Sequence, residues 1–183
     1  MIIQNTKIDG VKCILPELIT DSRGFFYRVF CQNELAVIKP NIVIAQINHN
    51  MSKIKGVIRG IHYQNPPHAE MKIAKCIRGS VFYVVVDLRK KSSTFLQWHG
   101  EILSADSMKS VLVPQGCAVG GQSLEDNSEI IYMSTAFYCK ESEGAIRYDE
   151  PKLNIQWPAK ITDISEKDAA IAYLSDEFDG VEI

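Results

Sequence analysis

The sequence lacks the charge excess and the long apolar runs that would direct it to nucleic acid or to a membrane. Among its 183 residues, 20 lysines and arginines are set against 22 aspartates and glutamates, which gives a formal net charge of −2. Any anionic ligand must therefore be bound by a local group of cations and not by the field of the whole molecule. No apolar run approaches the roughly 20 residues of a membrane span, and the N-terminal residues lack the pattern of a secretory signal. We expect a cytoplasmic protein with no nucleic-acid or membrane partner.

Cysteine and histidine are present, but without the spacing of a disulfide framework or a metal site. The five cysteines are Cys13, Cys31, Cys76, Cys117 and Cys139. Their odd number and the lack of a C-x-x-C pair argue against disulfides and a zinc ribbon and indicate reduced thiols. The four histidines are His49, His62, His68 and His99. Because no two of them have H-x-H or H-x-x-x-H spacing, we expect no metal site. The alternative is that folding brings His62, His68 and Glu70 together.

What the sequence does contain, from residue 2 to residue 138, is a succession of short apolar or alternating runs closed by Gly, Pro, Asn, Asp or Ser. This pattern predicts an all-β fold, and a length of 183 residues fits one domain. The clearest strand covers residues 80–88. Both of its faces are apolar, so we expect it to be central and covered on both sides. Further strands are expected at residues 10–16, 24–30, 42–48, 71–77, 97–103, 110–113 and 129–138.

Helical signals are confined to two short places. Ser165 is followed three residues later by the acidic Asp168, a variant of the capping box, which predicts a short helix from that point. Residues 31–37 are expected to form a turn of helix between two strands.

The most informative segment covers residues 56–72, with the sequence GVIRGIHYQNPPHAEMK. Its first half is rich in β-forming residues, so His62 is expected on a rigid strand and not on a mobile loop. On residue type alone, a structural histidine in a half-buried strand is the commoner case. The chain has no glycine-rich phosphate loop and no G-x-S-x-G motif, which leaves acid–base chemistry as the activity this segment offers.

Other polar residues are candidates for the same site. Lys72 begins an apolar run and is expected at the mouth of a cavity. Tyr132 and Tyr138 lie six residues apart in one predicted strand, which places them on one face about 20 Å apart, suited to opposite ends of an elongated ligand. Arg23 and Arg59 each offer a bidentate fork for a phosphate or diphosphate. For each of these side chains, an ordinary surface position is the alternative.

Taken together, these segments resemble the dTDP-4-dehydrorhamnose 3,5-epimerase family, the deoxysugar nucleotide epimerases of the cupin superfamily. The similarity covers nearly the whole chain in family order, through DSRGFF, QINHN, GVIRGIHYQNPPHAEMK, GSVFYVVVDLRKKSSTF, LSAD, VPQG, IIYMSTAFY, DEP, IQWP and SEKDAA. The resemblance implies a cupin-type jelly roll with a short C-terminal helix, as a single epimerase domain over residues 1–183. It also implies a homodimer with exchanged N-terminal strands, a nucleotide-sugar substrate and no cofactor.

The chemistry implied by the resemblance is proton transfer beside a ketone. In a nucleoside-diphosphate 4-keto-6-deoxysugar, the C4 carbonyl acidifies the hydrogens on C3 and C5, so positioned acid, base and oxyanion groups suffice to invert these centres. By resemblance, His62 is the general base, and Asp168 orients its ring and stabilises the imidazolium. Lys72 would neutralise the enolate oxygen. Tyr132 would return a proton from the opposite face.

The substrate contacts implied by the resemblance are spread along the chain. Arg23 and Arg59 match diphosphate-binding positions, and Tyr138 matches the aromatic residue that stacks on the nucleobase. Nucleotide or sugar contacts are further expected from Gln46, Asn48, Glu143 and Lys167. A regular strand would send Arg59 and His62 to opposite faces, so we predict a bulge or twist at Gly60 that lets both face the ligand.

Three positions depart from the family pattern and leave the substrate open. Val119 stands where the family usually has a histidine, Gly121 where it has a phenylalanine, and Arg28 where many members have a glutamate. Losing a polar pocket contact costs about 1–3 kcal/mol of binding, enough to shift specificity. The alternatives are therefore a 3-epimerase or ketoisomerase on another nucleotide sugar, such as a CDP-linked one, and a sugar-nucleotide binding protein without turnover. A metal-dependent cupin oxygenase is a remote third. The sequence does not fix the nucleotide base, inversion at C5 or the pathway.

Overall fold

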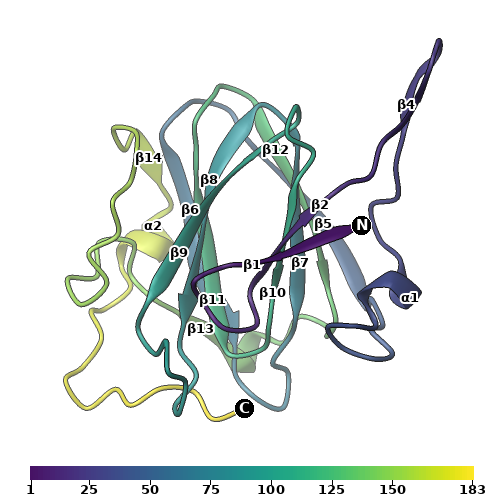
Figure 1. Ribbon diagram of the computed structural model, residues 1–183. Helices are drawn as coiled ribbons and strands as arrows, with labels where there is room; N and C mark the ends of the chain where they lie inside the picture. The colour runs from purple at the N-terminus through teal and green to yellow at the C-terminus, as the bar shows by residue number, and fades with distance from the viewer.

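Two antiparallel β-sheets packed face to face form the body of the molecule in the computed structural model, which describes residues 1–183 (Figure 1). The first sheet contains, in spatial order, β1 (Ile2–Asn5), β2 (Lys12–Leu15), β10 (Ser110–Val113), β7 (Lys72–Arg78), β12 (Ser128–Ser134) and β5 (Gln46–Ser52). The second contains β13 (Glu143–Ala145), β6 (Val57–Gln64), β11 (Cys117–Ser123), β8 (Ser80–Asp87) and β9 (Trp98–Ser104). The short β14 (Asp163–Ile164) adds to this sheet by pairing in parallel with β6. The expected all-β fold is confirmed.

The helices are few and short. They are α1 (Gln32–Leu35), the 3-10 turn η1 (Lys140–Ser142) and α2 (Glu166–Ala169). Both expected helical segments are confirmed, but α2 is a single turn that does not continue into the apolar residues after it. Neither α-helix comes near the length and apolar character needed to cross a membrane.

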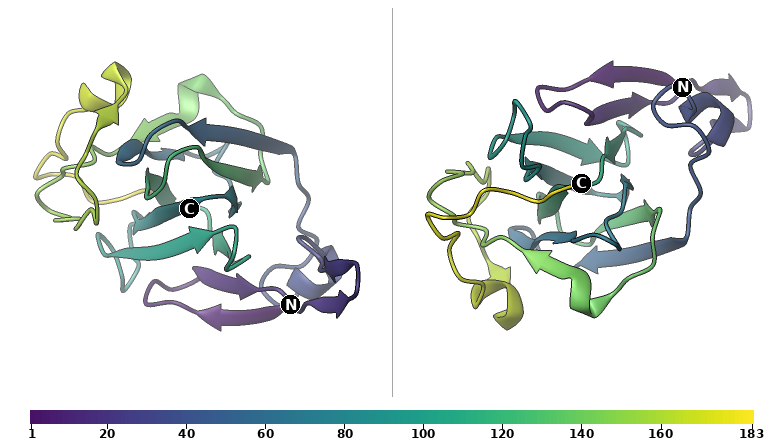
Figure 2. Two further views of the ribbon diagram at one scale, coloured as in Figure 1. Left: turned by 90° about the horizontal axis from the view of Figure 1, so that it is seen from above. Right: turned by 90° about the horizontal axis from the view of Figure 1, so that it is seen from below.

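The main core fills the space between the two sheets. It consists of small and branched side chains that point inward from both, with Ala74, Val85 and Val111 fully buried among them. The outer face of the first sheet is covered by the N-terminal part of the chain, where Leu35 of α1 belongs to the same buried cluster as Ile73. The C-terminal segment covers the outer face of the second sheet, as the two end views show (Figure 2).

Strand β8 illustrates how the sequence pattern becomes this sandwich. Val85 packs in the core between the sheets, whereas Val84 and Val86 pack under the C-terminal segment on the opposite face. All three are fully buried, and β8 lies between β11 and β9. The prediction of a central strand covered on both sides is confirmed.

A hairpin near the N-terminus departs from the sandwich. Strands β3 (Ile19–Asp21) and β4 (Gly24–Phe26) pair only with each other and project away from the body (Figure 1). Their apolar side chains are largely exposed, with Ile19 at 67% and Phe26 at 63%. The hairpin therefore has no partner surface within the chain.

Most predicted strands are present with shifted ends, and two are clearly too long. The strand predicted over residues 24–30 ends at Phe26. Strand β12 ends at Ser134, because that residue pairs with the first residue of β5, Gln46, and with the first residue of β7, Lys72. Beyond this point the backbone N–H of Thr135 still donates to the carbonyl of Met71 at 3.1 Å, but the ladder does not continue, and the chain leaves the sheet before Tyr138. The prediction of a strand over residues 129–138 is wrong at its C-terminal end. Strands β1, β3, β11, β13 and β14 were not predicted.

Candidate active site

A cavity of about 470 Å³ opens between the two sheets at the end that the core does not fill. Its walls come from β6, β8 and β11 on one side and from β5, β7 and β12 on the other, with α2 at the rim. A smaller cavity of about 130 Å³ adjoins it. His62, Lys72 and Tyr132 line both cavities and mark the place where they meet.

A bulge in β6 places two cationic or basic side chains in the larger cavity. In the pairing with β11, His62 is opposite Val119 and Gly60 is opposite Gly120, so Ile61 is an extra residue. Ile61 turns to the outer side and is fully buried there, while Arg59 and His62 both line the cavity. The predicted bulge is confirmed.

Gly60 makes this bulge sterically possible. Its φ of +98° lies in the left-handed region, which L side chains rarely adopt. A Cβ atom on Gly60 would also lie 2.7 Å from the Cα of Gly120, so the two strands could not approach as they do.

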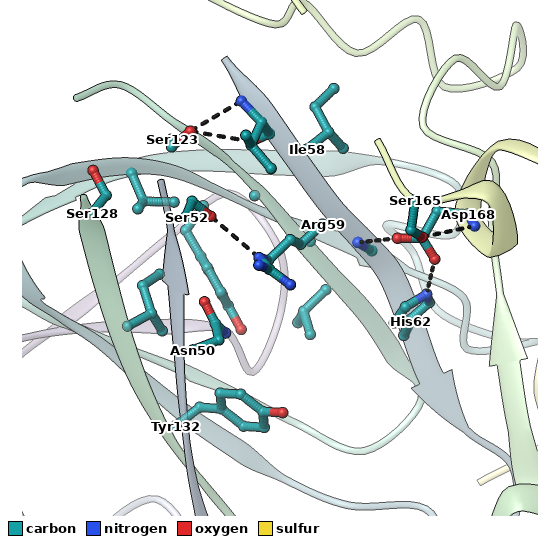
Figure 3. A pocket seen from close by; sticks show the side chains of 18 of the residues that line it. Asn50, Ser52, Ile58, Arg59, His62, Ser123, Ser128, Tyr132, Ser165 and Asp168 are labelled. Carbon is teal, nitrogen blue, oxygen red and sulfur yellow. Dashed lines mark hydrogen bonds and ion pairs between the residues drawn. The ribbon is translucent and has the colours of Figure 1, made fainter. Parts of the chain in front are cut away.

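Pairing at the edge of β6 brings Asp168 to His62 from far along the chain. Strand β14 pairs with the start of β6, and Ser165 directly after it caps α2 by accepting a hydrogen bond from the backbone N–H of Asp168 at 3.1 Å. The Asp168 side chain then turns toward β6. Its Oδ1 lies 2.7 Å from Nε2 of His62, and its Oδ2 accepts a hydrogen bond from the N–H of Gly60 at 3.3 Å (Figure 3).

This contact fixes the chemical state that His62 presents to the cavity. The Asp168 side chain is only 7% exposed, whereas that of His62 is 31% exposed and reachable by a ligand. An ionised carboxylate can only accept, so this contact favours the tautomer with the ring proton on Nε2, which leaves the lone pair on Nδ1. A histidine held in this way is equipped to act as a general base.

Lys72 and Tyr132 face this pair from the opposite sheet. Lys72 is the first residue of β7, and its Nζ lies 2.7 Å from Oε1 of Glu70. Tyr132 is on β12, and burial, reinforced by the negative charge of Glu70, raises the pKa of its phenol, although Arg59 opposes the shift. Tyr132 is therefore neutral and able to donate a proton at physiological pH.

Arg59 supplies positive charge between these groups. Its Nε donates to Oγ of Ser52 at 3.2 Å, and its Nη2 donates to the backbone oxygen of Met51 at 2.9 Å, so the guanidinium is tied to β5 across the cavity (Figure 3). The remaining N–H groups are free to bind an anion.

A group of polar side chains forms the rim of the smaller cavity. Oε2 of Glu143 accepts from Nζ of Lys167 at 2.7 Å and from the hydroxyl of Tyr138 at 3.2 Å. The Lys167 contact holds the pKa of Glu143 below its ordinary value, although burial opposes it. Gln46 accepts a hydrogen bond from the backbone N–H of Tyr138 at 3.0 Å. With 57% of Tyr138 exposed, its ring is open to stacking.

The structure brings most of the predicted site residues together, with two exceptions. Asn48 is opposite Tyr132 in the pairing of β5 with β12, so both side chains leave the sheet on the same face, but Asn50 lines the cavity and Asn48 does not. Arg23 lies on the projecting hairpin, 88% exposed and paired with Asp21 at 2.6 Å, and lines neither cavity.

Tyr132 and Tyr138 lie at one cavity, but Tyr138 is not on the strand predicted for it. Both line the smaller cavity, although Tyr138 lies in the loop after β12 and not on the strand itself. Their relation is therefore set by the loop, and the expectation that they share a strand face is wrong.

The alternative metal site is not assembled. The chain contains no group of three or more His, Cys, Asp or Glu side chains placed to hold a metal ion. Glu70 is instead held by Lys72 and by Gln64. Among the departures noted in the sequence, Val119 and Gly121 line the larger cavity, while Arg28 pairs with Glu34 on the N-terminal segment.

Asn50, Ser52 and Glu70 are among the polar residues of the cavity walls that sequence reasoning missed. The signal for the first two was available, because alternate residues of β5 share a face with Gln46 and Asn48. Glu70 was considered only as a metal ligand. Its spacing of two residues from Lys72 in an extended segment indicates a shared face, and hence an ion pair.

Comparisons with known proteins agree with one another. The family model described as dTDP-4-dehydrorhamnose 3,5-epimerase matches residues 5–176. The protein of that name from Salmonella typhimurium is 38% identical over 176 residues, covering 95% of this chain and 96% of its own. That from Pseudomonas aeruginosa is 40% identical over 156 residues, or 84% of each chain.

Solved structures give the same picture. A dTDP-6-deoxy-D-glucose-3,5-epimerase from Legionella pneumophila, in complex with dTDP-4-keto-L-rhamnose, has a TM-score of 0.91 at 37% identity and covers 99% of this chain and 97% of its own. A 3'-monoepimerase from Streptomyces bikiniensis, in complex with dTDP-quinovose, has a TM-score of 0.85 at 28% identity, with coverage of 92% and 85%. This likeness confirms the jelly roll expected from the sequence.

Proposed function

Because the chain belongs to the dTDP-4-dehydrorhamnose 3,5-epimerase family, we propose that it is an isomerase acting on a nucleotide-linked 4-keto-6-deoxysugar. The proposed substrate is dTDP-4-dehydro-6-deoxyglucose. The proposed reaction is epimerisation at C3 without a cofactor, with C5 as a second centre of the same chemistry. The observation that carries the proposal is the 2.7 Å contact between His62 and Asp168, facing Tyr132 and Lys72 across one cavity.

The mechanism proposed for this site has a base on one sheet and an acid on the other. Nδ1 of His62 takes the C3 proton, and the electron pair moves through the C3–C4 bond onto the C4 oxygen as an enolate. Lys72 stabilises this negative charge. Tyr132 then delivers its phenolic proton to the other face of C3, the enolate collapses to the ketone, and C3 is inverted. Solvent restores the proton of Tyr132 and removes the one held by His62.

The polar rim supports the position of the nucleotide. In the proposed arrangement Tyr138 stacks on the base, and Gln46, Asn48, Glu143 and Lys167 contact the nucleotide or the sugar. Arg59, whose guanidinium is tied to β5 and keeps free N–H groups, binds the diphosphate. The preference for thymidine over cytidine is tested by the thermal shift that each nucleoside diphosphate produces with the purified protein.

We also infer a homodimer in which the hairpin of β3 and β4 reaches the partner's cavity. The hairpin projects from the body and exposes Ile19, Phe25 and Phe26 at 67%, 57% and 63%, more apolar surface than an isolated element normally leaves in water. Arg23, at its tip, would then join Arg59 at the diphosphate. The single-domain organisation and the cytoplasmic location stay predictions.

Deuterium exchange tests the proposed reaction directly. Incubating the full chain with dTDP-4-dehydro-6-deoxyglucose in heavy water should replace the C3 proton with deuterium, and the C5 proton where that centre is also inverted, as followed by proton NMR. His62→Ala should abolish exchange. His49→Ala, on the outer face of β5 where His49 pairs with Glu129, should retain it. Wild-type exchange no faster than that of His62→Ala would contradict the proposed function.

A further inference from the structure

Glu70 is a buried carboxylate at the reaction centre to which the mechanism above gives no role. It lines the smaller cavity beside Lys72 and Tyr132, and its side chain is 5% exposed. A buried carboxylate is costly unless its oxygens are paired or hydrogen-bonded. Oε1 is paired with Nζ of Lys72 at 2.7 Å, and Oε2 accepts a hydrogen bond from Nε2 of Gln64. Both oxygens therefore have a partner.

Gln64 turns a hydrogen-bond donor toward residue 70. Its Oε1 accepts from the backbone N–H of Cys139 at 2.6 Å, and its Nε2 also donates to the backbone oxygens of His68 at 2.9 Å and Phe137 at 3.1 Å. These backbone contacts fix the orientation of the buried amide, so Gln64 turns its nitrogen, and not its oxygen, toward residue 70. Since Lys72 also presents only N–H groups, a side chain that accepts through both oxygens fits this place, as an ionised carboxylate does.

The charge of Glu70 acts on Tyr132 as well. Tyr132 shares the two cavities with a set of charged and titratable groups, which are Arg59, Lys72, Lys167, His62, Glu70, Glu143, Asp163, Asp168, Tyr63, Tyr83 and Tyr138. Of these, Glu70 adds to the effect of burial in raising the pKa of Tyr132, and Arg59 opposes it. A negative charge beside a phenol disfavours the phenolate, which keeps the proton available for transfer.

We propose that Glu70 is a positioning residue of this active site, which holds the ammonium of Lys72 against the cavity wall and places a negative charge in the same cavity as Tyr132. This inference rests on the roles of Lys72 and Tyr132 in the proposed function. Glu70 occupies one N–H group of the Lys72 ammonium, so the other two are available to a ligand in the cavity.

Titration of Tyr132 by NMR tests the proposal without turnover. Labelling the tyrosines with ¹³C at the ring carbon that bears the hydroxyl gives one signal for each, and Tyr132→Phe identifies the signal of interest. In Glu70→Gln the midpoint of Tyr132 should fall by about one pH unit, because the negative charge is removed. The phenol is the active form, so the alkaline limb of the exchange rate should move to lower pH with it. Exchange on the plateau should fall by about 10- to 100-fold, as the lysine is less well placed.

Two further variants separate charge from placement. Glu70→Asp keeps the charge but shortens the side chain, so the midpoint of Tyr132 should stay near the wild-type value while exchange falls. If Glu70→Gln does not fold, the exchange rate of Glu70→Asp decides whether Glu70 positions Lys72. Glu101→Gln removes a carboxylate that pairs with Lys109 at 2.9 Å outside both cavities, and should change neither the midpoint nor the exchange.

The outcomes distinguish this proposal from the proposed function. An unchanged Tyr132 midpoint in Glu70→Gln, or unimpaired exchange in Glu70→Asp, overturns the role of Glu70 and leaves the epimerase intact. Absence of exchange in the wild type rejects the epimerase, but the NMR titration would still report whether Glu70 controls Tyr132.

Discussion

Asp168 takes part in a helix cap and also contacts His62. The sequence offered it as part of a helix cap and, by resemblance, as the partner of His62. In the structure its backbone N–H is capped by Ser165, which leaves the carboxylate free to accept from His62 and from Gly60. The cap therefore orients the residue, and the carboxylate serves the cavity.

Replacement of Asp168 by asparagine should separate these two roles. The amide has one acceptor and one donor where the site presents two N–H groups, and it carries no charge to stabilise the imidazolium. We expect Asp168→Asn to lower the rate of C3 exchange by about 10²- to 10⁴-fold, as for other carboxylate–histidine pairs, while the backbone cap and the fold are retained. Asp106→Asn, in the exposed turn after β9, serves as the matched control and should exchange at the wild-type rate. Exchange in Asp168→Asn within twofold of wild type would show that His62 does not need the charge.

The position of a single side chain was predictable from the sequence where it depended only on the spacing of residues along one strand. The bulge at Gly60 followed from the need to turn Arg59 and His62 to the same side, and the structure has it. Glu70 could not be assigned in the same way, because its role depends on Gln64, whose amide is fixed by a loop more than seventy residues away. No local pattern encodes that contact.

Strand β6 carries the next prediction, at the scale of one element. Gly60→Ala adds a Cβ at a positive φ and 2.7 Å from the Cα of Gly120. We expect the free energy of unfolding in urea to fall by about 2–4 kcal/mol, because backbone strain and overpacking both contribute. C3 exchange should fall as well, since Arg59 and His62 would no longer be held on one side.

Gly24→Ala provides the control for backbone strain alone. Gly24 has a φ of +127°, but a Cβ there would meet nothing within 4 Å. Its free energy of unfolding should therefore fall by about 1 kcal/mol. Equal losses for the two variants would mean that the close approach of β6 and β11 does not constrain the site.

Elements were predicted well where alternation is strong and poorly where pairing decides their ends. Residues 135–138 have β-forming side chains, yet β12 ends at Ser134 because both neighbouring strands begin opposite it. Helix α2 likewise stops after one turn, although apolar residues follow. In both cases the limit is set by tertiary contacts, which a sequence window does not contain.

At the scale of the whole molecule, the cavity is a consequence of topology. His62 and Asp168 are more than one hundred residues apart, and the parallel pairing of β14 with β6 brings them together. Periodicity predicted a β-rich sandwich, but it could not predict which sheet edge the C-terminal segment would join. The family resemblance supplied that information, and it also named Arg23, whose place in a single chain is outside the cavity.

The exposed position of Arg23 leads to a prediction about the dimer. If the hairpin of one chain completes the cavity of the other, Arg23→Ala and His62→Ala should each lack exchange activity as homodimers, but a mixed dimer should contain one intact site. That site combines His62 of the Arg23→Ala chain with the hairpin of the His62→Ala chain, and the second site carries both defects. Random pairing of equal amounts makes half of the dimers mixed, so about a quarter of all sites should be active.

The mixed dimers are prepared by unfolding and refolding the two variants together. As a control, the two variants are refolded separately and then combined, so that no mixed dimer forms. The exchange rates of the two samples are compared. Recovery near a quarter of the wild-type rate, only after joint refolding, is the expected result. Arg28→Ala, whose side chain pairs with Glu34 on the same N-terminal segment, should retain activity alone and thus controls for general damage to that segment. If joint refolding restores no activity, Arg23 acts on its own chain or not at all, and the hairpin must be exposed for another reason.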